Sequence, residues 1–97
     1  MVNQIIQEQL DNQISQLKKI VEKPSAPPNV NIYLIMALRQ LAKVLTLNEH
    51  NRFKVWRINK AIECLCTAMQ TLQCTKETKN EIVAITCQLE NITYSLT

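Results

Sequence analysis

The sequence predicts an all-α fold, a small four-helix and mostly antiparallel bundle, and three observations carry that prediction. Apolar residues recur at spacings of three and four along four stretches, which is the pattern of amphipathic helices. The 97 residues include no glycine, the residue on which tight hairpins and phosphate-cradling loops usually depend. Short polar segments join the last three stretches, which favours antiparallel neighbours. A chain of this length makes one small domain, residues 1–97.

The first helix is expected over residues 1–22 and the segment 23–29 is expected to be a proline-rich linker. Each of Pro24, Pro27 and Pro28 lacks a backbone donor and disfavours helix at the residue before it. The helix could therefore fold back on its own chain or reach a neighbouring copy. Its apolar stripe consists of Ile6, Leu10, Ile14, Leu17 and Val21.

Residues 30–97 are expected to form a three-helix core. The second helix should run to about Leu47, with Asn29 or Asn31 as its N-cap. Apolar residues cover more than half of its circumference, so we expect neighbours on most sides. Only a narrow stripe should face water, made of Arg39, Lys43 and Thr46.

The third helix is expected over residues 52–74, and the fourth should continue to the end of the chain. Thr78 and Glu81 fit a capping box for the fourth helix, in which hydroxyl and carboxylate each satisfy an orphan amide. The core face of the third helix should hold Val55, Ile58, Ile62, Leu65, Met69 and Leu72.

Positive charge is concentrated between residues 39 and 60. This segment has a net charge of +5 in a chain whose total is +3, so the remaining residues sum to −2. Glu49 is its single acid. Such segregation indicates a surface that meets something negative. The six cations are Arg39, Lys43, Arg52, Lys54, Arg57 and Lys60.

Two aromatic residues, Phe53 and Trp56, lie within this basic segment. On a helical wheel they fall roughly opposite the core stripe of the third helix, whereas Lys54 falls at the core edge. Cations neutralise phosphates and exposed rings stack on unpaired bases. We therefore expect Phe53 and Trp56 to act as stacking or anchoring groups. The expected nucleic-acid-binding residues are Arg39, Lys43, Arg52, Arg57 and Lys60.

Two other interpretations of Phe53 and Trp56 stay open. The first helix needs an apolar partner for its stripe and could cover both rings, leaving the cations as a solvated rim. Alternatively, Trp56 and its arginine neighbours could anchor a protein partner, because tryptophan and arginine are favoured at interface centres. A protein partner or a homo-oligomer is also compatible with nucleic-acid binding.

The sequence offers little for catalysis. Cys64 and Cys66 are two positions apart, so on a helix their side chains point about 200° apart and cannot share a zinc ion. Cys66 is expected in the core or at its boundary, and Cys64 and Cys74 are expected to be more exposed. His50 is the only histidine and falls in a turn, so no cysteine has an evident base. We expect no catalytic or metal-binding residue, no cofactor and no small-molecule substrate, and therefore not an enzyme.

The expected location is the cytoplasm and no membrane contact is expected. No stretch approaches the ~20 apolar residues of a membrane span. No basic region leads into an apolar N-terminal segment, so reduced thiols are expected for the four cysteines. Together these features predict a small accessory or adaptor subunit that contacts a nucleic-acid backbone. The alternative is a protein-interaction or self-associating module that binds no nucleic acid.

Overall fold

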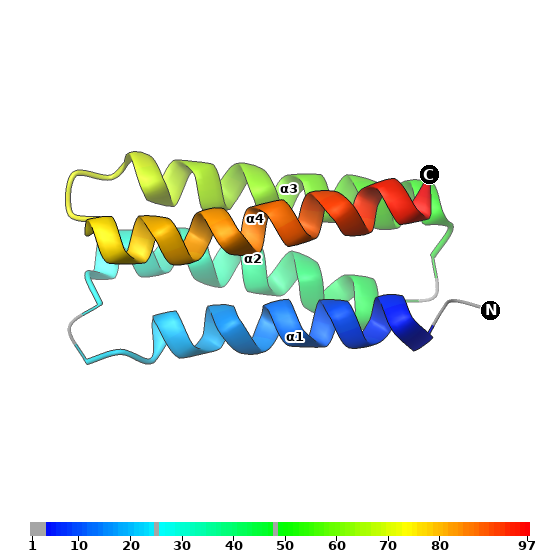
Figure 1. Cartoon of the computed structure of the whole chain (residues 1–97), viewed down its shortest axis with the longest axis horizontal. Coiled ribbons are helices and arrows are strands. Elements are labelled where there is room, and N and C mark those ends of the chain that lie inside the picture. The colour runs from blue at the N-terminus through cyan, green and yellow to red at the C-terminus, as the bar shows by residue number, and fades with distance from the viewer. Residues whose placement is uncertain (1–3, 25, 48) are drawn as a thin grey trace.

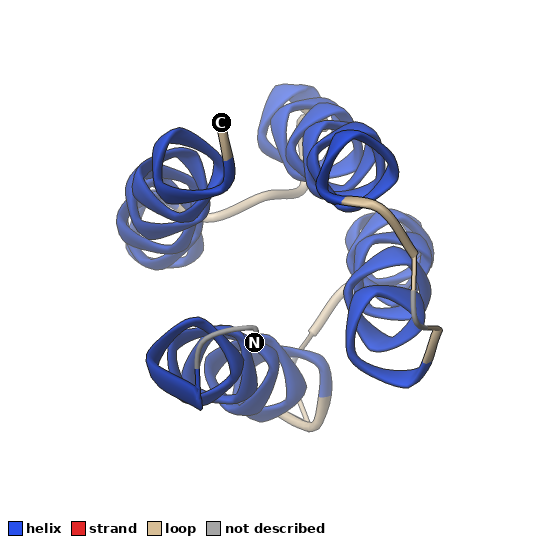
Figure 2. Cartoon of the chain, turned by 90° about the vertical axis from the view of Figure 1, so that its right-hand side faces the viewer, coloured by secondary structure: helices blue, strands red, loops and turns tan. Residues whose placement is uncertain are grey.

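A computed structural model describes residues 4–24, 26–47 and 49–97, and within them the chain forms four helices. They follow one another as an up-down-up-down bundle in which each helix is antiparallel to its neighbours (Figure 1). The end-on view shows the four helices around one shared axis (Figure 2). The molecule measures 40 × 20 × 19 Å. The helices are α1 (Gln4–Val21), α2 (Pro28–Thr46), α3 (Asn51–Gln70) and α4 (Lys76–Leu96).

The predicted all-α bundle is confirmed, and α1 belongs to it. α1 packs against α2 and α4 of the same chain, and α3 lies between α2 and α4. The stripe of α1 therefore finds its apolar partners in cis, across the bundle core. Leucine and isoleucine fill this core from all four helices, with the largest fully buried side chains being Leu10, Leu17, Ile20, Leu34, Leu41, Ile58, Leu65, Ile82 and Leu89.

The proline segment is shorter than expected, because α2 already begins at Pro28. Pro27 occupies the N-cap position with extended backbone and Pro28 follows it, where a proline loses no helical hydrogen bond. The predicted caps Asn29 and Asn31 were wrong, since both lie inside α2. The Asn31 side chain instead donates to the carbonyl of Val21, 3.3 Å away, and so satisfies the last turn of α1.

The boundary between α3 and α4 also differs from the prediction. α3 ends at Gln70 and α4 starts at Lys76, with Thr75 as its N-cap; the Thr75 hydroxyl accepts from the Thr78 amide at 3.1 Å. The capping box predicted at Thr78 and Glu81 was therefore wrong by one turn. Glu81 is freed to pair with Lys23 at 2.7 Å, which ties the end of α1 to α4.

Two residues near this turn therefore differ in exposure from the prediction. Leu72, expected in the core, lies in the turn and is fully exposed, whereas Cys74, expected to be exposed, is buried. The outer face of α2 is also more apolar than predicted, with Ile32, Ile35 and Met36 exposed beside its basic stripe. None of the four helices, within the ranges described above, is apolar over a length that would cross a bilayer.

Candidate nucleic-acid interface

The seven predicted site residues lie on two neighbouring antiparallel helices. α2 carries two of them and the first half of α3 carries five, and these two helices pack directly against each other. We name this surface the basic-aromatic face. It consists of Arg39, Lys43, Arg52, Phe53, Trp56, Arg57 and Lys60.

Both aromatic rings of this face are open to solvent. Trp56 retains 52% and Phe53 retains 44% of its accessible surface. The interpretation that α1 covers them was wrong, because α1 packs on α2 and α4 and does not reach α3. Neighbouring exposed apolar side chains are one of the features that mark binding surfaces.

Cations of the same helix lie over these rings. The guanidinium of Arg52 is 4.9 Å from the centre of the Phe53 ring. The Trp56 ring has the Arg57 guanidinium at 5.9 Å and the Lys60 ammonium at 5.7 Å. Contacts of this kind contribute about 0.5–1 kcal/mol each at exposed sites. They also hold positive charge beside the ring surfaces.

A shallow open hollow lies between the two rings. It is lined by Arg52, Phe53 and Trp56 alone, and its walls are mostly apolar. The two aromatic residues are three positions apart, so they stand on the same side of α3 in successive turns. The hollow therefore offers an apolar surface for a flat group, with a guanidinium at its edge.

Arg57 is held differently from the other cations of the face. Its Nε donates to Glu49 Oε1 at 2.6 Å and its Nη2 donates to Glu49 Oε2 at 3.1 Å. Nη1 donates to Gln40 Oε1 of α2 at 3.3 Å. The hydrogen bonds with Arg57 hold the pKa of Glu49 below its ordinary value, and the pKa of Arg57 is raised in turn. Much of the Arg57 charge is thus compensated.

The remaining cations are more available. Among the described residues, Arg39, Lys43 and Arg52 take part in no ion pair. Lys60 has only a long contact of 3.5 Å with Glu63, and both side chains are exposed; such pairs contribute little. Lys54 is not part of the face, because its side chain is buried on the inner side of α3.

Glu49 and Gln40 are two residues of this site that the sequence did not single out for a role. Together they fix the guanidinium of Arg57 beside the Trp56 ring and join the α2–α3 turn to both helices. The one available signal was that Glu49 is the only acid in a strongly basic segment. Its partner was not evident, because it depends on how the turn folds.

The thiols of Cys64 and Cys74 lie in surroundings that disfavour the thiolate. Burial raises the pKa of both Cys64 and Cys74, which lowers the thiolate fraction. Within the described parts of the chain, no three histidine, cysteine, aspartate or glutamate side chains gather as metal ligands would.

Comparison of the chain with models of known protein families, with curated protein sequences and with solved structures finds no match. The residues of the face themselves are therefore the basis for a proposal about function.

Proposed function

We propose that this protein is a non-enzymatic accessory module that binds a nucleic-acid strand through its basic-aromatic face. The observation that carries the proposal is the exposure of Phe53 and Trp56 with cations held over their rings. The exposed surface of these rings adds nothing to the packing of the core, whereas the bases of a nucleic acid stack on such rings.

The charges on the face support the same proposal. Arg39, Lys43 and Arg52 would contact phosphates directly, because each is exposed and no ion pair compensates it among the described residues. Lys60 would add a weaker contact. Arg57, which the sequence predicts as an equal member of the set, would mainly position the Trp56 ring, since Glu49 neutralises it.

The single tryptophan allows a direct test. Labelled or unlabelled oligonucleotides of DNA and RNA, single- and double-stranded, would be titrated while Trp56 fluorescence is recorded. The triple variant Arg39→Glu, Lys43→Glu, Arg52→Glu should lose binding. A matched variant with the same charge change on other exposed positions, Lys18→Glu, Lys19→Glu, Lys76→Glu, should retain most of it. Equal loss in both variants, or no binding by the wild type at low salt, would contradict the proposal.

A second candidate function is recognition of a protein partner at the same place. Ile32, Ile35 and Met36 are exposed on the outer face of α2, so apolar surface is present beside the cations. An interface centred on Trp56 would depend only weakly on salt and would be lost on Trp56→Ala. Phosphate binding, in contrast, weakens steeply as salt rises.

The four cysteines fit a reducing compartment such as the cytoplasm. All four lie in the described part of the chain and each is a free thiol. We propose that location on this ground, and quantitative alkylation of thiols in freshly lysed cells would test it.

A further inference from the structure

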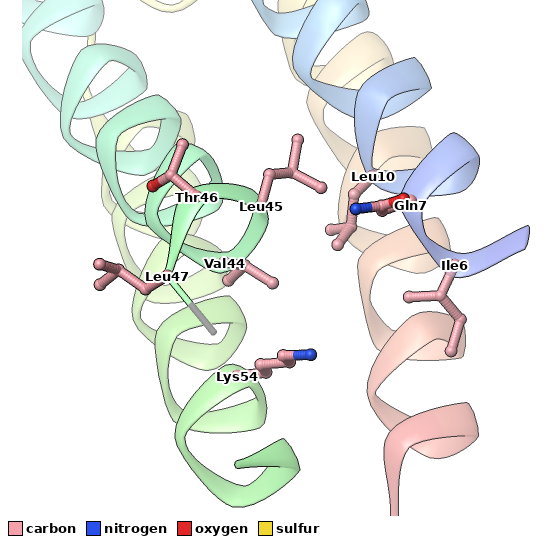
Figure 3. A pocket seen from close by; sticks show the side chains of 8 residues that line it. All are labelled: Ile6, Gln7, Leu10, Val44, Leu45, Thr46, Leu47 and Lys54. Atoms are coloured by element: carbon pink, nitrogen blue, oxygen red, sulfur yellow. The ribbon is translucent and has the colours of Figure 1, made fainter. Parts of the chain in front are cut away.

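A second feature lies on the inner side of α3, where the Lys54 side chain points toward the inside of the bundle. Its side chain retains only 7% of its accessible surface, although lysine is rarely buried without a partner. Figure 3 shows the side chain reaching from α3 toward α1, into a space bounded by Ile6, Leu10 and Val44. The residue is not used by the basic-aromatic face.

The space in front of Lys54 is a cavity of about 250 Å³. Its floor is buried and apolar, with Ile6, Leu10 and Val44, whereas Gln7, Thr46 and Leu47 at its rim are exposed. The cavity therefore opens to solvent. An apolar protein cavity of about 150 Å³ holds benzene, so this one holds roughly ten non-hydrogen atoms.

No carboxylate of the described residues forms an ion pair with Lys54, and the residues outside the description include no aspartate or glutamate. Glu49 lies close enough for Lys54 to help lower its pKa, but that carboxylate is bonded to Arg57. The C-terminal turn of α2 also lines the cavity. Its dipole carries only about half a negative charge, so it offsets part of the ammonium charge and not all of it.

We propose that this cavity is a binding site for a small amphipathic carboxylate. The carboxylate would accept hydrogen bonds from the Lys54 ammonium, with the Gln7 amide at the rim as a second donor. The aliphatic or aromatic body of the ligand would lie against Ile6, Leu10 and Leu45. Pairing would give the Lys54 ammonium a counter-charge inside the cavity, and an apolar floor with a few convergent polar groups is typical of small-molecule sites.

Octanoate, which has ten non-hydrogen atoms, is a suitable probe, and 1-octanol is its uncharged counterpart. Isothermal titration of the full chain should show one saturable octanoate site, and 1-octanol should bind at least about tenfold more weakly. Lys54→Met keeps an unbranched apolar stem and should weaken octanoate binding by about tenfold or more. Lys76→Met, at an exposed position in the first turn of α4, is the matched control and should leave octanoate binding unchanged.

Three results would overturn the proposal. One is equal binding of 1-octanol and octanoate by the wild type, which would mean that the Lys54 ammonium interacts only with the dipole of the C-terminal turn of α2 and not with the ligand. Another is octanoate binding that survives in Lys54→Met, and the third is no saturable octanoate binding to the wild type. If Lys54→Met fails to fold, the comparison of octanoate with 1-octanol on the wild type still shows whether the carboxylate is recognised. The outcome is independent of nucleic-acid binding, because none of the cavity residues belongs to that face.

Discussion

Trp56 contributes little to the packing of the bundle, because half of its surface remains in water. Trp56→Ala should lower the free energy of unfolding by about 1–2 kcal/mol, mainly through loss of the two cation–π contacts of its ring. The affinity for a single strand should fall by about 1–3 kcal/mol through loss of stacking, which is roughly 5- to 150-fold. Fluorescence anisotropy of a labelled oligonucleotide measures this change.

Tyr94→Ala is the matched control for that variant. Tyr94 is also exposed, but it lies on α4, which contributes no residue to the basic-aromatic face. Its removal should leave affinity unchanged. Equal losses for the two variants would mean that Trp56 has no special role in binding.

The ion pair between Glu49 and Arg57 should make stability depend on pH in a defined direction. Hydrogen bonds to Arg57 hold the pKa of Glu49 below its ordinary value of 4.5. The contribution of the pair is thus fully present above about pH 4.5 and is lost as pH falls through the lowered pKa. Wild type should exceed Glu49→Gln in urea stability at neutral pH, and the gap should close in strong acid. A gap that persists unchanged in acid would rule out this pair as its source.

Single residues also show where sequence reasoning stops. Periodicity predicted that Trp56 lies opposite the core stripe, and the structure agrees. It could not say whether another helix covers that side, since coverage depends on which helices become neighbours. The partner of Glu49 could not be predicted for a related reason. Arg57 lies eight positions further along the chain, and the pairing depends on the conformation of the α2–α3 turn, which the sequence pattern does not specify.

At the scale of helices, the existence of all four was predictable, because each carries a regular apolar stripe. The residues at which the helices begin and end were less predictable. Thr75 and Thr78 are both plausible caps, and Thr78 with Glu81 matches the capping pattern better. The chain uses Thr75, which adds one turn to α4 and leaves Glu81 available for the ion pair with Lys23. Long-range pairs of this kind do not appear in a local pattern.

Thr75→Ala should destabilise the protein by about 1 kcal/mol, through loss of the N-cap hydrogen bond to the Thr78 amide. Thr78→Ala should cost less, since the hydrogen bond of the Thr78 side chain is to the Thr75 hydroxyl and satisfies no backbone amide of α4. Chemical denaturation of the two variants provides the comparison. A larger loss for Thr78→Ala would place the start of α4 one turn later than described.

At the scale of the whole molecule, α1 completes the core, although a proline segment connects it to the rest. Leu17 is fully buried in the bundle, so Leu17→Ala should lower the free energy of unfolding of the whole chain by about 2–5 kcal/mol. Unfolding should stay a single transition by circular dichroism. Ile5→Ala, at an exposed position of α1, should have little effect. A separate early transition with partial loss of helicity would show that α1 folds apart from the other helices.

The whole-molecule arrangement also decides the charge of the basic-aromatic face. The cations of the basic-aromatic face lie on two adjacent helices, α2 and α3, and α1 packs on α2 and α4 and not on α3. Of its five cations, three are unpaired among the described residues and Lys60 is only weakly paired. We therefore expect three to four phosphates to be neutralised on binding.

The salt dependence of single-strand affinity tests this central claim most directly. Each neutralised phosphate of a single strand contributes about −0.7 to the slope of log K against log salt concentration, so we expect a slope of roughly −2 to −3. The measurement is a series of Trp56 fluorescence titrations across salt concentrations. A slope near zero, or no detectable binding at low salt, would contradict the account and leave the basic-aromatic face as a surface for a protein partner.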